Sequence, residues 1–378
     1  MCTANKESLE KLMQDENIYQ VVPIDIKLGI DVLPFKMTRE MMCEVAFWAQ
    51  NQASFKAAAE IIKKTHDISL SASTIRTVAE FIGKIIFEQD TAEANLAFER
   101  REDIKCENKK TGILYVQMDG ATLNTRLKNN DGSSWRENKL GMCFSSDNIS
   151  VRINKKGEEI GQIQKKEYTS YVGSVSEFKK YLFACAKRNG YGQYETTVII
   201  SDGAQWIHNM CKELFPDATH ILDLFHLCEN TYSFAKAIFK GDEAKYVPWA
   251  EDMVKKFKNS ETNEVIEELK KYKKRKLPKN TVNLYNYVSN NIDRIDYKHY
   301  KSLGYYVGSG AIESGNKVVM QKRLKLAGMR WDEIYAQYLL TLRTKFESGL
   351  WKTVVSTVLS CNFPVALRKS RKRKNPGK

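Results

Sequence analysis

The chain has 378 residues, a formal net charge of +14 and 42% apolar residues, enough for a real core and two or three domains. The basic surplus favours a polyanionic partner, nucleic acid first, although a ribosome-associated or membrane-surface role would also fit the charge. No apolar run reaches the roughly 18 residues of a membrane span, and the N-terminus lacks the apolar core of a signal peptide.

Eight cysteines are scattered along the chain without a CxxC pair, which indicates reduced thiols and a cytoplasmic protein. His208 with Cys211, and His226 with Cys228, are conceivable zinc ligands. Their spacing is irregular and supporting ligands are missing, so we do not expect structural zinc.

Residues 1–37 give mixed signals and are interpreted as a leader of uncertain structure. Residues 38–110 are predicted to be helical, with a charged connector from about residue 88. Apolar residues recur at helical spacing in "MTREMMCEVAFWAQ" and "SFKAAAEIIKKTH", and Ser73 is the expected N-cap of a third helix through Ile86. Two short helices, a turn and a capped helix outline a helix-turn-helix, although an ordinary three-helix bundle gives the same pattern. The residues expected to face DNA are Ser73, Thr74, Arg76 and Thr77.

Two strands of the same design follow, "GILYVQMDGA" and "VIISDGAQWI", and in each an apolar run leads to Asp-Gly-Ala. A single Asp-Gly pair is readily explained as a turn. Two of them, at Asp119 and Asp202, suggest a shared site, because functional groups gather at strand ends in open α/β sheets. Neighbouring carboxylates repel, and a divalent metal ion would remove that repulsion.

Residues 111–226 are predicted to form the first part of an α/β catalytic domain. Further strands are expected over 138–153 and 159–173, with a hairpin turn at Lys155–Gly157 between them. After these come a helix from about Ser174, the strand that ends at Asp202, a helix Ala204–Leu214 and a strand Thr219–His226. The order β-β-β-α-β-α-β is that of the ribonuclease-H-like fold, in which one carboxylate lies on strand one and a second at the end of strand four.

Residues 227–304 are charged and helical and are interpreted as an insertion domain. Residues 305–350 complete the catalytic domain, with a Gly-Ser-Gly loop and a helix from about Ala311 to Ala327. Glu313 lies in the first turn of that helix, where the helix dipole alone could explain an acidic residue. Residues 351–378 are expected to be a basic tail, solvated and disordered from Arg368 to Lys378.

The segments "MDGA", "ISDGAQWI", "ILDLFHLCEN" and "GSGAIESGNKVVMQKRLKLAGMRW" resemble the DDE transposases of bacterial insertion sequences, in the Kra-type group related to Mutator-like transposases. The resemblance covers roughly Thr111 to Phe346. It implies that Asp119, Asp202 and Glu313 form the catalytic triad. Asp223-Leu-Phe-His226 matches the C/D-x-x-H signature of these groups, which makes His226 a candidate catalytic residue; a buried, hydrogen-bonded histidine is the equal alternative.

The implied chemistry is metal-dependent cleavage and strand transfer of double-stranded DNA, at transposon ends and target. Three carboxylates suffice to hold Mg²⁺, with Mn²⁺ as a substitute. A homodimer or higher oligomer on DNA and a location at the bacterial nucleoid are expected. Residues expected to contact phosphates or an unpaired base are Lys317, Lys322, Arg323, Lys325, Arg330 and Trp331. For Trp331, packing in a core is the alternative.

Two other interpretations remain open. A ribonuclease-H-like nuclease that does not transpose, such as a junction resolvase, would use the same carboxylates but would not need the helical insertion. A catalytically inactive DNA-binding protein derived from a transposase would show a broken triad, whereas all three acidic residues are present here.

Overall fold

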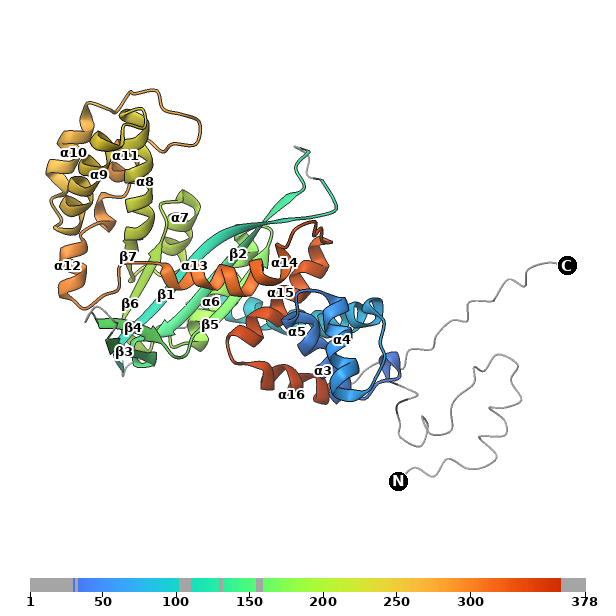
Figure 1. The fold of residues 1–378 in the computed structure, drawn as a ribbon. Coiled ribbons are helices and arrows are strands. Elements are labelled where there is room, and N and C mark those ends of the chain that lie inside the picture. Colours follow the sequence, from blue (N-terminus) through green and yellow to red (C-terminus); the bar gives the residue numbers. More distant parts are fainter. Residues whose placement is uncertain (1–29, 31–32, 102–109, 129–131, 154–158, 362–378) are drawn as a thin grey trace, which may run out of the picture.

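A mixed five-stranded β-sheet lies at the centre of the computed structural model, which describes residues 30, 33–101, 110–128, 132–153 and 159–361. The strands are β1 (Lys110–Asn124), β2 (Trp135–Ser145), β5 (Glu167–Val172), β6 (Tyr194–Ser201) and β7 (Thr219–Leu222), in the order β5-β2-β1-β6-β7. β2 is antiparallel to both of its neighbours, whereas β1, β6 and β7 run parallel. The expected α/β class is confirmed, with many helices around the sheet (Figure 1).

β1 continues past Asp119, where we expected it to end. Its parallel pairing with β6 stops at Gln117, opposite Ile200, but its antiparallel pairing with β2 continues to Asn124. The Asp-Gly pair is therefore part of a strand and not a turn. Asp119 has β2 on one side and lies just beyond the end of β6 on the other.

Alternate residues of β1 are buried on opposite faces of the sheet, as expected for a strand that is covered on both sides. The helices concerned are α6 (Val175–Arg188), α7 (Gln205–Leu214), α13 (Gly310–Asn316) and α15 (Glu333–Glu347). Leu114, Val116 and Met118 share an apolar core with residues of α6 and α7. Tyr115 belongs to the second core, which includes residues of α13 and α15. The sheet is thus covered by helices from distant parts of the sequence.

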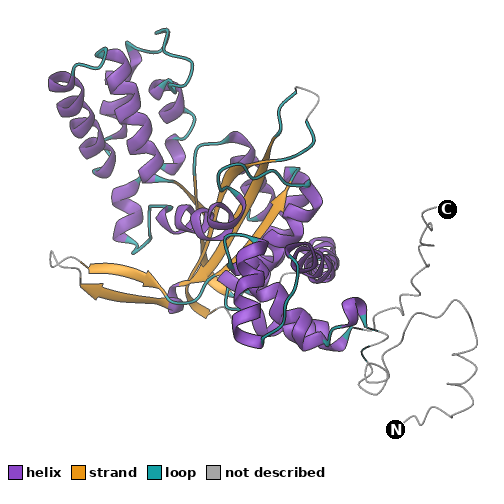
Figure 2. Ribbon diagram, turned by 45° about the vertical axis from the view of Figure 1, so that its right-hand side comes forward, coloured by secondary structure: helices purple, strands orange, loops and turns teal. Residues whose placement is uncertain are grey.

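The two long strands expected over 138–153 and 159–173 are each divided. The elements found there, besides β2 and β5, are η3 (Ser146–Asn148), β3 (Ile149–Ile153) and β4 (Glu159–Ile163). The 3-10 turn η3 ends β2, and β3 then pairs with β4 in a separate two-stranded sheet. Figure 2 shows this hairpin projecting from the body of the protein. The expected turn at Lys155–Gly157 lies outside the described residues.

The N-terminal helices pack with the last two helices of the described chain around one apolar core. The elements are η1 (Pro34–Lys36), α3 (Arg39–Asn51), α4 (Phe55–His66), α5 (Ala72–Glu99), and, beside α15, α16 (Trp351–Ser360). The N-cap of α5 is Ser71 and not Ser73: the Ser71 hydroxyl accepts from the amide of Thr74 at 3.0 Å. α5 runs well beyond Ile86, because no proline or glycine interrupts residues 87–99. α16 occupies the start of the expected tail, and Arg368–Lys378 lies outside the described residues.

A group of helices follows β7 and stands at one end of the molecule, at the upper left of Figure 1. They are α8 (Leu224–Ile238), α9 (Glu243–Lys258), α10 (Thr262–Lys270), α11 (Leu284–Ser289), η4 (Ile292–Arg294) and α12 (Tyr297–Ser302). β7 ends at Leu222, earlier than expected, because Asp223 caps α8 through the amides of Phe225 and His226.

In the described part of the chain, no helix has the length and apolar character needed to cross a membrane.

The single helix expected from Ala311 to Ala327 is irregular. It consists of α13, the π-helical turn η5 (Lys317–Gln321) and α14 (Lys322–Leu324). Arg343 of α15 explains the π turn in part, because its guanidinium donates to the backbone carbonyls of Val318 and Val319. A side chain that binds backbone carbonyls in this way perturbs the regular hydrogen-bond ladder of a helix.

Candidate active site

Three aspartates lie at the carboxyl edge of the parallel strands β1, β6 and β7, which are neighbours in the sheet. The last pair between β1 and β6 joins Gln117 with Ile200, and Asp119 and Asp202 each follow that pair by two residues. β7 lies next to β6, and Asp223 follows its last residue directly. Parallel strands present their carboxyl ends at one edge, so the register alone places the three side chains on adjacent positions.

Asp119 is held by two hydrogen bonds. Its Oδ1 accepts from the amide of Gly120 at 2.7 Å, and its Oδ2 accepts from Nδ2 of Asn316 at 2.6 Å. Burial raises the pKa of Asp119 and the charge of Asp202 adds to that effect, whereas the two donors and His226 oppose it; the pKa is raised overall. A bound cation would stabilise the ionised form of such a carboxyl group.

Asp202 lies between β6 and α7, and its Oδ1 accepts from the amide of Ala204 at 3.0 Å. Ser201, the residue before Asp202, is held in place by His220. The hydroxyl of Ser201 is 2.8 Å from Nε2 of His220, which lies 3.1 Å from Nη1 of Arg294 in the helical group. Burial, with the charge of Arg294, lowers the pKa of His220 to about 3, so this imidazole is neutral and acts as a fixed support.

Asp223 is fully buried and accepts five hydrogen bonds. Its Oδ1 accepts from the amides of Phe225 (3.0 Å) and Ser309 (2.9 Å). Its Oδ2 accepts from Nδ1 of His226 (2.6 Å), from the amide of His226 (3.3 Å) and from the hydroxyl of Ser309 (2.6 Å). Burial raises the pKa of Asp223, but the hydrogen bonds from His226, Ser309 and Phe225 outweigh burial and lower it overall. Asp223 is therefore an ionised carboxylate whose oxygens are already occupied.

Glu313 joins Asp223 and His226 in a group that could hold a metal ion, since one ligand atom from each lies within 4.8 Å of the others. The oxygens of Asp223 are occupied, and Oε1 of Glu313 accepts from the hydroxyl of Ser309 at 3.3 Å, which leaves the other oxygen of Glu313 and Nε2 of His226 as the remaining metal-ligand atoms of this group. A carboxylate that fixes the ring of a ligating histidine is a common arrangement around metals. Among the described residues, Asp119, Asp202 and the cysteines considered for zinc do not belong to this group.

The pKa of His226 is changed by the carboxylates of the site. Its hydrogen bond to Asp223 raises its pKa, burial opposes this, and the charges of Asp223, Asp202 and Asp119 add to the rise; the pKa is about 9. The carboxylates of Asp119 and Asp202 therefore lie close enough to His226 to stabilise its charged form. The imidazole is protonated at neutral pH unless a cation displaces the proton.

We expect the stability of the protein to fall at alkaline pH because of this histidine. The pKa is about 9 in the folded protein against 6.5 for a free histidine. The stabilisation is thus complete below pH 6.5 and is lost as the pH rises through 9. Urea unfolding at about pH 6.5 and about pH 9.5 should show a smaller loss in His226→Gln than in the wild type. His299→Gln, at an exposed histidine, is the control, and an equal loss in all three proteins would contradict the assignment.

A buried glutamine also ties the Glu313 segment to the sheet. Gln117 of β1 accepts from the amide of Ile312 at 3.2 Å and donates to the carbonyl of Gly308 at 3.4 Å. The same segment is held by Asp223 through Ser309 and by Asp119 through Asn316. Three separate side chains of the sheet edge therefore fix the position of α13.

Sequence reasoning did not single out Gln117, Ser309 or Asn316. Gln117 did leave a signal, a polar residue inside the apolar run "ILYVQMD". Asp223 left a stronger one, because it begins the D-x-x-H pattern and directly follows a strand. Ser309 and Asn316 become visible only once the fold brings their partners to them.

The residues expected to bind DNA fall into two regions. Ser73, Thr74, Arg76 and Thr77 lie in the first two turns of α5, and all but the half-buried Thr74 are exposed. Lys317, Lys322, Lys325 and Arg330 are exposed along η5, α14 and the following loop. Both regions are therefore available for contacts with phosphates.

Arg323 is not on that exposed surface, where we expected it to contact phosphates. Its side chain is buried, and Nε donates to the carbonyl of Ala49 at 3.0 Å. Its guanidinium also lies 4.5 Å from the ring centre of Phe55. The physical reason is tertiary: α14 packs on the last turn of α3 and the loop after it, where the carbonyls of Ala49 and Ala53 need a donor.

Trp331 is half-buried, which agrees in part with the packing alternative. Its Nε1 donates to the carbonyl of Leu324 at 3.0 Å, and its ring meets Phe55 edge-on. Its backbone extends the end of β1, because the Trp331 amide donates to Asn124 and its carbonyl accepts from Arg126. The indole is thus fixed in place at the border of two parts of the chain.

No protein-family model matches the chain, and no curated protein matches it. Among solved structures, the chain is similar to one described as the Drosophila P element transposase strand transfer complex. The identity is 11%, the match covers 92% of this chain and 85% of that one, and the TM-score is 0.26. Neither the fold nor the function of this chain is inferred from a similarity of that size.

Proposed function

We propose that the protein is a DDE transposase with a ribonuclease-H-like catalytic core, which binds transposon-end DNA and catalyses metal-dependent cleavage and strand transfer. The observation that carries this proposal is the register of β1, β6 and β7, which puts Asp119, Asp202 and Asp223 on adjacent positions at one edge of the sheet, with Glu313 of α13 beside Asp223. The β-β-β-α-β-α-β order of the main sheet supports it as well. Residues 111–226 and 305–350 form the core, 227–304 the insertion, and 38–110 the DNA-reading part.

The donors at this edge fit Mg²⁺ or Mn²⁺. Asp119, Asp202 and Glu313 offer hard carboxylate oxygens, which Mg²⁺ prefers, and His226 offers one ring nitrogen. A bound ion would help to activate the attacking water or 3′-hydroxyl and would stabilise the leaving oxygen of the phosphodiester. The chain itself orients the donors, since Asp223 fixes the His226 ring and the Ser309 backbone ahead of α13.

The decisive experiment incubates the pure protein with candidate transposon-end DNA and Mg²⁺ or Mn²⁺ and maps the products at nucleotide resolution. Cleavage at the end together with joined products supports the proposal. Cleavage without joining favours a nuclease that does not transpose. End-specific binding without cleavage favours an inactive DNA-binding protein. If the protein neither binds nor cleaves this DNA, the proposed role on DNA is wrong.

The exposed lysines after Glu313 should set the salt dependence of DNA binding. Replacing Lys317 and Lys322 with Gln should weaken binding to end and random DNA equally and flatten the salt slope by roughly one unit per lost phosphate contact. Thr74→Ala and Thr77→Ala should instead reduce the preference for end DNA, if α5 enters the major groove. Anisotropy titrations at several salt concentrations measure both effects. If the lysine variants lost affinity for end DNA alone, the lysines would read the sequence and would not merely position the DNA.

A further inference from the structure

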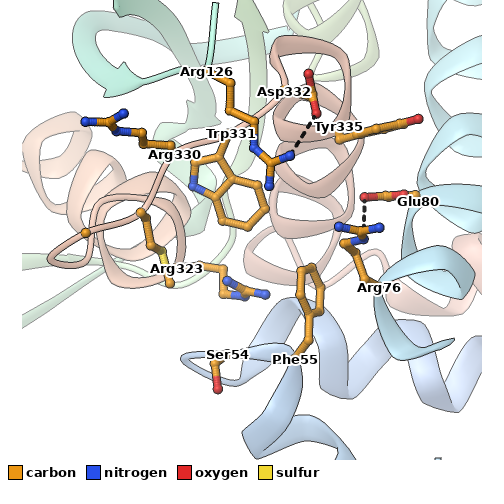
Figure 3. Close-up of a pocket in the computed structure, with 12 residues that line it drawn as sticks. Ser54, Phe55, Arg76, Glu80, Arg126, Arg323, Arg330, Trp331, Asp332 and Tyr335 are labelled. Carbon is orange, nitrogen blue, oxygen red and sulfur yellow. Dashed lines mark ion pairs between the residues drawn. The ribbon is translucent and has the colours of Figure 1, made fainter. Parts of the chain in front are cut away.

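A pocket of about 330 Å³ lies between the N-terminal helices and the loop that follows α14, apart from the acidic edge of the sheet. Its wall combines aromatic rings with arginines and two carboxylates. It is lined by Ser54, Phe55, Arg76, Glu80, Arg126, Arg323, Gly328, Met329, Arg330, Trp331, Asp332 and Tyr335. Figure 3 shows the side chains of Arg76, Arg126, Trp331 and Phe55 around the hollow, with Arg76 paired with Glu80 and Arg126 with Asp332.

Two arginines of the wall are held by long, partly exposed ion pairs. Arg76 lies 3.5 Å from Glu80, and Arg126 lies 3.7 Å from Asp332. Exposed pairs of this length contribute little stability, so both guanidiniums can move toward a ligand at small cost. The carboxylates remain beside them and can accept hydrogen bonds from an amino group, which a bare phosphate does not have.

A third arginine gives the pocket a buried positive charge. Arg323 is 2% exposed, and within the described chain its Nη2 has no hydrogen-bond partner. Its guanidinium carbon is 5.4 Å from the ring centre of Trp331, on the wall of the hollow. Burial and the charge of Arg343 lower the pKa of Arg323 to about 10, so it is still charged at neutral pH. This positive charge, which no carboxylate of the described chain neutralises by an ion pair, favours an electron-rich or anionic ligand in the adjoining hollow.

The structure assigns this pocket to one unpaired nucleotide of the DNA, with its base among Trp331, Arg126 and Arg76 and its phosphate at Arg330 on the rim. Aromatic rings and guanidiniums stack on bases of any sequence, while Glu80 and Asp332 can accept from an exocyclic amino group. A fully paired duplex cannot enter a hollow of this size, because its bases are stacked inside the helix. The choice of DNA as the ligand rests on the proposed function.

The test compares three DNAs in EDTA: a paired duplex, the same duplex with a one-nucleotide bulge of 2-aminopurine, and the single strand that carries this base. Base stacking contributes about fivefold or more in affinity, so the wild type should prefer the bulged duplex by that factor and quench its fluorescence. Arg126→Gln should abolish most of the preference while leaving binding to the paired duplex within about twofold. Arg152→Gln removes the same charge from an exposed position on the β3–β4 hairpin and is the control.

Equal affinity of the wild type for paired and bulged duplexes would overturn the assignment, as would an unchanged preference in Arg126→Gln. Trp331→Phe keeps an aromatic ring in the wall and guards against a folding defect: it should retain part of the quenching. Because no metal is present, the outcome does not depend on cleavage. The preference is measured in EDTA and cleavage is measured separately with Mg²⁺, so a failure of this inference can be told from a failure of the catalytic proposal.

Discussion

Asp119→Asn, Asp202→Asn and Glu313→Gln should each lower the rate of DNA cleavage by about a thousandfold or more. Each replacement keeps the size of the side chain but removes one carboxylate charge from the edge of the sheet. Charge stabilisation by a bound ion is worth several kcal/mol in a transition state, and about 4 kcal/mol corresponds to a thousandfold in rate. Single-turnover cleavage of end DNA with Mg²⁺ and with Mn²⁺ measures the loss.

Folding and DNA binding should survive these changes. Asp119 carries a raised pKa, so its neutral replacement removes a charge whose burial is costly. Matched controls are Asp217→Asn and Glu213→Gln, which make the same chemical change at exposed positions of the same domain. Full activity in any one of the three acidic variants would exclude that residue from the catalytic group.

Asp223→Ala should cause the largest loss of stability, about 3–5 kcal/mol in the free energy of unfolding. The change leaves the amides of Phe225 and Ser309, the hydroxyl of Ser309 and the ring of His226 without their acceptor. It also removes the cap of α8. Urea unfolding followed by circular dichroism gives the difference.

Asp223→Asn is the informative companion, because it keeps one oxygen and the shape of the side chain. The amide nitrogen then faces donors that need an acceptor, so we expect about 1–3 kcal/mol. Asp217→Ala, at an exposed aspartate between α7 and β7, should leave the unfolding midpoint essentially unchanged. If Asp223→Ala were as stable as the wild type, Asp223 would have no role in holding the site.

The sequence predicted the elements that depend on local pattern. The β-branched run before Asp202 and the apolar run before Asp119 are strands, and the Asp-Gly pairs mark the correct edge of the sheet. The α/β class follows from the same alternation of strands and helices. The D-x-x-H pattern likewise marked the start of α8, although the strand was predicted to run through it.

The rest depends on contacts between distant segments. The sequence predicts Arg323 as an exposed basic residue on a helix, and only the carbonyls at the end of α3 and in the following loop explain its burial. The π turn beside it is explained in part by Arg343, a residue of another helix that donates to its carbonyls. Residues 138–173 are divided between two sheets because a turn at Ser146 ends β2. The hydrophobic pattern of the sequence does not predict this turn.

The helical group between β7 and α13 has a consequence for the order in which the site is assembled. Asp119, Asp202 and Asp223 are all synthesised before these helices, whereas Glu313 comes after them. Closing so long a connection adds only about 0.6 kcal/mol for each doubling of its length, but such non-local contacts form slowly. Glu313 is therefore made last of the four acidic residues, and the contacts of Ser309 with Asp223 and of Asn316 with Asp119 can form only after the whole helical group has been synthesised.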